Sequence, residues 1–278
     1  MKKIVASNPV TAFVVITFFF SWTLWLLMIL SNNNLLPFKF PTTFWGSFGP
    51  LVGSILITSI IYGKDGLKKI LLSLVSIKSD LPNYIFALFL IAGIYAFTIL
   101  IIHFIEPAAA ATGKLPGAGD LIKYFFIILA IGGPLGEEIG WRGFLQLELH
   151  KRFTPLTASA VIGIIWFTWH IPLFWLEGAA QEGSSLISFF VSVVSMTFLF
   201  TWLFLRTGGS LFFAILFHTS INYVSALIIP FLFPASGESR MFNMIFIIIL
   251  AAAAIIFTSV SRKNFLYKHD KEKIHFRN

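Results

Sequence analysis

The residues whose chemistry could support catalysis lie in three strongly apolar stretches of this sequence. They are Glu137, Glu138 and Arg142 in the first stretch, His170 in the second, and His218 with Asn222 in the third. A charged side chain in hydrocarbon costs several kcal/mol, about 3 on insertion scales, so such residues usually face a polar cavity. Because a base, hydrogen-bond donors and possible metal ligands occur together at membrane depth, we expect a hydrolytic site inside the membrane.

The spacing of the two glutamates and the arginine predicts how they differ in role. In an α-helix residues i and i+4 share a face, whereas adjacent residues are about 100° apart. Glu138 is therefore expected to pair with Arg142 and stay ionised, while Glu137 points along a neighbouring face and is free to act as a general base toward water. The alternative is an ion pair at the inner end of a helix, where charged side chains reach water at little cost.

The histidines are weaker signals when they are taken one at a time. A lone histidine on an apolar face, such as His170, is more often a hydrogen-bonded packing residue than a ligand. His218 and Asn222 are four residues apart, so on a helix their side chains face the same way. Asparagine can donate to a developing oxyanion, and histidine can donate or bind a metal. Polar groups on three separate apolar segments indicate one shared site.

The composition is that of a polytopic membrane protein. Apolar residues make up 57% of the 278 residues, charged residues only 12%, and the mean hydropathy is +0.87, whereas soluble domains carry about 25% charged residues. Membrane spans use nearly all of the sequence, so we expect a single integral membrane domain over 1–278 and no separate soluble domain. The absence of cysteine excludes disulfides, thiolate zinc sites and a cysteine nucleophile.

Apolar runs of the length needed to cross a bilayer, about 20 residues each, predict an all-α bundle of eight transmembrane helices. The predicted spans are 9–31, 43–62, 83–105, 121–141, 157–175, 185–205, 210–229 and 241–261. Gly132-Gly133-Pro134 interrupts the fourth span, and Pro172 falls near the end of the fifth. Irregular backbone is tolerated at depth where it lines a cavity or is covered by protein. These breaks therefore indicate either a polar site or a kink used only for packing.

Lysine and arginine are distributed so that both termini are expected in the cytoplasm. With that topology fifteen basic residues lie on the inner side, and four, namely Lys39, Lys114, Lys123 and Arg240, lie outside or at the outer edge. The positive-inside bias accounts for the net charge of +8 without a nucleic-acid partner. The basic cytoplasmic tail 262–278 either holds anionic lipid or serves the topology alone.

The three polar clusters together resemble the motifs of a known family of membrane proteins. The matching segments are Glu137-Glu138 with Arg142 (EExxxR), Trp166 to His170 (FxxxH), and His218 to Asn222 (HxxxN). In this order, over a core of roughly 121–226, they resemble the CPBP family of CAAX-protease and bacteriocin-processing membrane proteins, also called the Abi or type II CAAX prenyl endopeptidase family. One position departs from the pattern, because Trp166 stands where the family usually has phenylalanine.

The resemblance implies roles for the residues of the first two motifs. Glu137 is expected to activate the attacking water with help from His170. Glu138 and Arg142 are expected to orient the site around that water. The resemblance thus agrees with the division of roles that the helical spacing predicts for the two glutamates.

The resemblance also implies a role for the third motif and a possible metal site. His218 and Asn222 are expected to stabilise the tetrahedral oxyanion. The family is often described as metalloproteases, and Glu137, His170 and His218 offer a possible set of ligands for a divalent metal such as Zn²⁺. A metal-free glutamate mechanism uses the same residues, and no HExxH helix is present to require a metal. Both mechanisms stay open at this point.

We therefore expect an intramembrane endopeptidase acting on membrane-associated peptides, either prenylated peptides or small secreted ones. The expected partners are membrane lipid and a peptide or lipidated-peptide substrate, in a bacterial cell membrane, with a polar cavity that opens to the cytoplasm. A non-catalytic bacteriocin-immunity or partner-binding membrane protein is the main alternative. A transporter that uses Glu137 and Glu138 as proton or cation sites is another. The sequence does not set the oligomeric state.

Overall fold

The structure is a computed structural model that describes residues 2–37, 43–105, 113–233 and 240–267. Within these ranges the chain is helical and contains no strand. Eight helices there are long and apolar enough to cross a membrane, which confirms the predicted all-α polytopic bundle. Lys39 and the end of the predicted basic tail, residues 268–278, lie outside the described residues.

The membrane-crossing helices follow the predicted order. They are α2 (Pro9–Asn32), α3 (Gly49–Leu74), α4 (Leu81–Ile105), the consecutive α5 (Ala118–Ile131) and α6 (Pro134–Gly140), α8 (Pro155–His170), α9 (Leu186–Arg206), α10 (Leu211–Tyr223) and α12 (Arg240–Val260). The shorter helices are α1 (Lys2–Ser7), α7 (Leu147–His150), α11 (Ile229–Leu232) and α13 (Arg262–Leu266). Short 3₁₀-helices cover Thr43–Phe48 and Ile171–Trp175, and π-helical segments cover Trp141–Gln146 and Val224–Ile228.

The second span is longer than predicted. It was expected to end at residue 62, but α3 continues to Leu74 across Gly63, whose φ of 60° and ψ of −149° are not helical. A positive φ of this kind is accessible to glycine without a steric penalty, so the helix changes direction there and then continues. The lysines that follow Gly63 ended the apolar pattern in the sequence without ending the helix.

The fourth span is broken where the glycines and proline predicted a break, but it runs on further than expected. Gly133 has a φ of 101°, and Pro134 then occupies the first turn of α6, a position where its missing N–H costs nothing. Instead of ending at residue 141, the span continues through the π-helical segment to His150. The break places the start of a new helix, α6, directly before the two glutamates.

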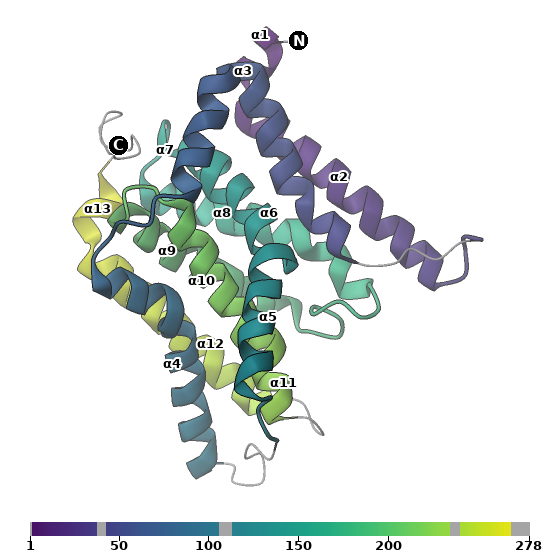
Figure 1. The fold of residues 1–278 in the computed structure, drawn as a ribbon, viewed down its shortest axis with the longest axis vertical. Helices are drawn as coiled ribbons and strands as arrows, with labels where there is room; N and C mark the ends of the chain where they lie inside the picture. The colour runs from purple at the N-terminus through teal and green to yellow at the C-terminus, as the bar shows by residue number, and fades with distance from the viewer. Residues whose placement is uncertain (1, 38–42, 106–112, 234–239, 268–278) are drawn as a thin grey trace.

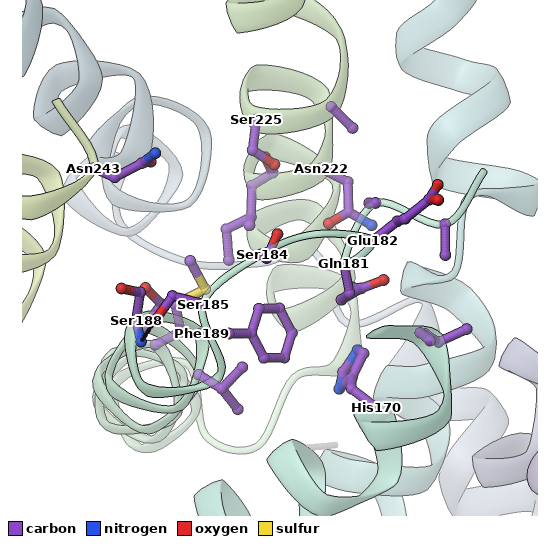
Figure 2. Close-up of a pocket in the computed structure, with 18 of the residues that line it drawn as sticks. His170, Gln181, Glu182, Ser184, Ser185, Ser188, Phe189, Asn222, Ser225 and Asn243 are labelled. Carbon is purple, nitrogen blue, oxygen red and sulfur yellow. Dashed lines mark hydrogen bonds between the residues drawn. The ribbon is translucent and has the colours of Figure 1, made fainter. Parts of the chain in front are cut away.

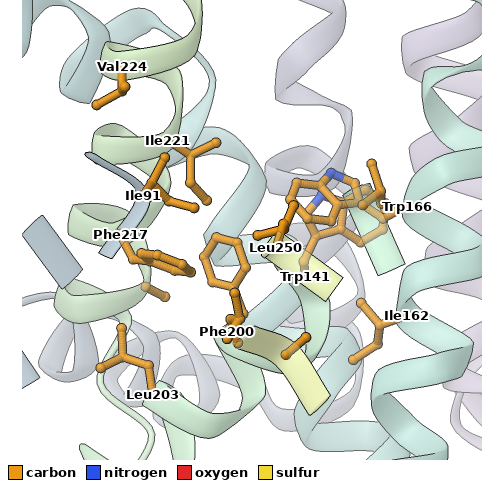
Figure 3. Close-up of a cluster of buried hydrophobic side chains, with 14 of the residues drawn as sticks. Ile91, Trp141, Ile162, Trp166, Phe200, Leu203, Phe217, Ile221, Val224 and Leu250 are labelled. Carbon is orange, nitrogen blue, oxygen red and sulfur yellow. The ribbon is translucent and has the colours of Figure 1, made fainter. Parts of the chain in front are cut away.

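Helix α10 runs through the middle of the bundle and contacts α4, α5, α6 and α9 (Figure 1). An aromatic core joins the elements that carry the predicted site residues (Figure 3). In it Phe200 of α9 lies 4.8 Å from Phe217 of α10 and 5.8 Å from Trp166 of α8, measured between ring centroids. Trp141 belongs to the same core and is fully buried. This packing holds α6, α8 and α10 at fixed distances around the polar groups.

Candidate active site

Glu137 lies in the first turn of α6 and is only 6% exposed. Two indole groups donate hydrogen bonds to its Oε2, Trp166 Nε1 at 2.8 Å and Trp141 Nε1 at 3.4 Å. The other oxygen, Oε1, has no hydrogen bond to any residue that the structure describes, and it lies on the side of Gly133. One carboxylate oxygen is therefore held by the protein, and the other is available to a small molecule.

Glu138 and Arg142 form the ion pair that their spacing predicted. Arg142 Nη1 lies 3.0 Å from Oε1 and 2.9 Å from Oε2 of the glutamate, and both side chains are 0% exposed. The guanidinium also stacks on aromatic rings, 3.8 Å from the Phe200 centroid and 4.7 Å from that of Trp166. A pair enclosed in this way is not a solvated ion pair at a helix end, which rules out the alternative reading of this motif.

His218 completes this buried group from α10. Its Nδ1 lies 2.7 Å from Glu138 Oε1, so the carboxylate accepts a hydrogen bond from the ring and fixes its orientation. The remaining ring nitrogen, Nε2, is left for the pocket, which His218 also lines. Helices α6 and α10 are thus joined by a chain of contacts that runs from arginine to carboxylate to imidazole.

His170, at the end of α8, is oriented by its own helix. Its Nδ1 lies 2.8 Å from the carbonyl oxygen of Trp166, one turn earlier. The ring is packed among aromatic groups, with centroids 4.7 Å from Trp169 and 5.1 Å from Phe189. With Nδ1 engaged by the backbone, Nε2 is the nitrogen that remains for chemistry.

Asn222 does not bond to His218, although both residues line the same pocket. Its Nδ2 donates to the carbonyl oxygen of Gly132 at 3.0 Å. This oxygen belongs to the break between α5 and α6, where the regular helical acceptor pattern ends. Asn222 therefore ties α10 to the backbone that precedes Glu137, and sequence reasoning did not anticipate this contact.

Four of the six predicted site residues line one pocket of about 900 Å³, namely Glu137, His170, His218 and Asn222. Glu138 and Arg142 are buried behind them. Figure 2 shows the part of the pocket where His170 and Asn222 approach polar residues of the 181–188 segment. The structure thus brings the three sequence motifs together, as their common occurrence in apolar segments indicated.

The position of the pocket conflicts with one pair of expectations. The 181–188 segment that borders it lies at the ends of α8 and α9 opposite to Lys151 and Arg206. The predicted orientation places those basic residues in the cytoplasm, so this border faces outward. If both termini are cytoplasmic, as predicted, this border of the pocket does not open to the cytoplasm, so the two expectations are not compatible.

The possible metal ligands do not form a metal-binding group in this arrangement. Among the described residues no three histidine, aspartate or glutamate side chains gather closely enough to hold a metal ion. Hydrogen bonds within the protein occupy His218 Nδ1 and Glu137 Oε2, so Nε2 of the histidine and Oε1 of the glutamate are the atoms that remain for a ligand.

Sequence reasoning missed the donors around the first glutamate. Trp141 follows Glu137 by four residues, a spacing that places both side chains on one helix face. Trp166 precedes His170 by four residues, and its indole reaches Glu137 from another helix. The first contact was detectable from spacing alone, whereas the second requires the packing of α8 against α6.

Comparisons with known proteins cover the region that contains these residues. Residues 120–224 match the family model described as type II CAAX prenyl endopeptidase Rce1-like. A curated relative, CAAX prenyl protease 2 of Methanococcus maripaludis, is 28% identical over 152 residues, which cover 52% of this chain and 54% of the relative. The chain thus matches about half the length of that relative, and the matched family region contains all six predicted site residues. Over this region the chain is similar to the CAAX/CPBP family of membrane proteases.

Proposed function

We propose that this protein is an intramembrane endopeptidase that uses Glu137 to activate water. The observation that carries the proposal is the asymmetric setting of this carboxylate. Oε2 is held by two indole N–H groups, while Oε1 is left for a water molecule in a pocket shared with two histidines. A positioned base of this kind contributes about 10²- to 10⁴-fold to a hydrolysis rate.

In the first step the water oxygen forms a bond to the carbonyl carbon of the scissile peptide, and its proton passes to Glu137. His170, whose ring is fixed by the Trp166 carbonyl, assists by holding the water through Nε2. The carbonyl oxygen becomes an oxyanion. His218 stabilises it through Nε2 in its protonated form, in which both ring nitrogens carry a proton, while Nδ1 remains bonded to Glu138.

In the second step the carbon–nitrogen bond breaks and the proton held by Glu137 passes to the leaving amine. Asn222 has a second amide hydrogen besides the one donated to Gly132, and this hydrogen is available to the oxyanion. The atoms balance as one water added across one peptide bond. No step of this mechanism requires a metal.

Ser188, Ser192 and Asn243 line one part of the pocket, here called the outer wall. This part suits a polar segment of the substrate better than a lipid chain. Hydroxyl groups elsewhere in the spans, such as those of Thr168 and Thr197, donate to the carbonyl oxygen four residues earlier, so they need no partner from another helix. Ser188 and Ser192 line the pocket and make no such side-chain bond among the described residues, and Asn243 faces the same space. We infer that an unlipidated peptide segment lies here.

The proposed function is tested with Glu137→Gln and His218→Ala in cells and with purified protein. Each change should lower peptide cleavage at least about 100-fold while the protein still inserts. Glu148→Gln is the matched control, because this carboxylate lies on the same span but bonds to Lys151 and Tyr62 at the inner end. It should leave cleavage unchanged.

Peptidomics of membrane fractions from wild-type and Glu137→Gln cells identifies the substrate, which should accumulate uncleaved in the variant. The same peptide, synthesised with and without a prenyl group, tests the inference about the outer wall. A cellular phenotype that survives both site variants would favour a non-catalytic immunity or binding role. Ion movement across liposomes without any cleavage would favour a transporter.

A further inference from the structure

Trp166 contacts four of the six predicted site residues, although its indole takes part in none of the proposed chemical steps. It is 3% exposed, and its Nε1 donates to Glu137 Oε2 at 2.8 Å. Its ring lies under the Arg142 guanidinium at 4.7 Å and edge to face with the His218 ring at 5.5 Å. Its carbonyl oxygen accepts from His170. One residue of α8 thus touches groups from α6, the π-helical segment and α10.

We propose that Trp166 is a positioning residue that selects which oxygen of Glu137 acts as the base. The proposal rests on the proposed function, in which Oε1 receives the proton of water. A free carboxylate turns about its last torsion and offers either oxygen, because that torsion is broad and roughly two-fold. The short indole bond holds Oε2 on the protein side, so Oε1 is kept toward the pocket.

The indole N–H is the feature that matters, and not the bulk of the ring. A phenylalanine at this position could still pack beneath Arg142 and beside His218, but it has no hydrogen to donate. Trp141 supplies a second donor to the same oxygen, but at 3.4 Å, where a hydrogen bond is weak. Replacing Trp166 by phenylalanine should therefore lower activity more than replacing Trp141 by phenylalanine.

The first experiment compares Trp166→Phe with Trp141→Phe in steady-state cleavage of the peptide found by peptidomics. Loss of a hydrogen bond to a charged group corresponds to about a 10- to 100-fold effect. We expect kcat of Trp166→Phe to fall by that factor with KM unchanged, because the lost hydrogen bond is made to the base and not to the substrate. Trp141→Phe should lower kcat less.

Trp202→Phe is the matched control for the loss of an indole hydrogen bond. Trp202 Nε1 donates to Ser261 Oγ at 2.9 Å, near the inner ends of α9 and α12 and away from the pocket. This variant loses a bond of nearly the same length and the same ring atoms as Trp166→Phe. It should cleave with the wild-type kcat and KM. If Trp166→Phe behaves like this control, the proposal is wrong.

A second measurement does not depend on catalysis. In protein labelled with ¹⁵N-tryptophan, the indole N–H signal of Trp166 is assigned by its absence from Trp166→Phe. Glu137→Gln exchanges its charged acceptor for a neutral one, so this signal should shift while that of Trp202 stays in place. An unchanged Trp166 signal overturns the proposal. A shifted signal in a protein that cleaves nothing would support the contact and refute the proposed function instead.

Discussion

The enclosed pair of Glu138 and Arg142 gives the most direct test of the described site. Arg142→Met removes the guanidinium that lies 2.9 to 3.0 Å from both carboxylate oxygens, and it leaves a carboxylate of 0% exposure with His218 as its remaining polar contact. Removing one partner of a buried pair costs about 3–5 kcal/mol, because the other charge stays in a medium that solvates it poorly.

The double variant Glu138→Gln/Arg142→Met separates charge from packing. Replacing both members of a buried pair by uncharged groups of similar volume is often neutral or stabilising, so the double variant should regain most of the stability lost by Arg142→Met. Both variants should fail to cleave peptide. In the double variant His218 loses the ionised carboxylate that orients its ring, and in the single variant that carboxylate loses the guanidinium that holds it in place. The double variant is therefore expected to regain stability without regaining activity.

The assay is reversible unfolding in detergent micelles with increasing sodium dodecyl sulfate, followed by circular dichroism. Lys151→Met is the control on the same segment, because it breaks a pair in which the lysine side chain is 47% exposed and should cost about 0–1 kcal/mol. A loss below about 1 kcal/mol for Arg142→Met, or a double variant as unstable as the single one, would refute the burial of this pair.

Two further predictions concern the backbone at Glu137 and the metal. Gly133→Ala should abolish cleavage and lower the free energy of unfolding by about 1–2 kcal/mol, because φ is 101° and the new Cβ would lie 2.9 Å from Glu137 Oε1. Gly117→Ala, where a Cβ meets nothing within 4 Å, is its control in the same stability and cleavage assays. Treatment with 1,10-phenanthroline should leave cleavage by purified protein unchanged, because no step of the proposed mechanism requires a metal. Loss of activity on chelation, with recovery on adding Zn²⁺, would contradict the metal-free mechanism.

The helices and the local pairs were predictable from the sequence because they depend on neighbours along the chain. Apolar runs determine spans, and a spacing of four residues brings Glu138 to Arg142. The break before Glu137 was equally predictable, since Gly133 and Pro134 restrict the backbone by their own chemistry. These features need no knowledge of how the helices pack.

The contacts between helices could not be predicted in the same way. His218 was expected to act with Asn222, its neighbour on one helix face, but its nearest polar partner is Glu138, 80 residues earlier. Asn222 bonds instead to Gly132, 90 residues earlier. The indole of Trp166 reaches Glu137 only because α8 packs beside α6. Such contacts depend on the rotation of whole helices, which local periodicity leaves undetermined.

The π-helical segment Trp141–Gln146 has a consequence for the register of the whole fourth span. A π-turn holds one residue more than an α-turn, so everything beyond it is rotated by about 100° from where a regular helix would put it. Glu138 on one side meets His218, and Glu148 on the other meets Tyr62 at 2.6 Å. Deleting one residue between Glu138 and Glu148 would restore a regular helix, in which only one of the two glutamates could face its partner. The additional residue thus allows one membrane span to contact two neighbouring helices that lie at different angles around it.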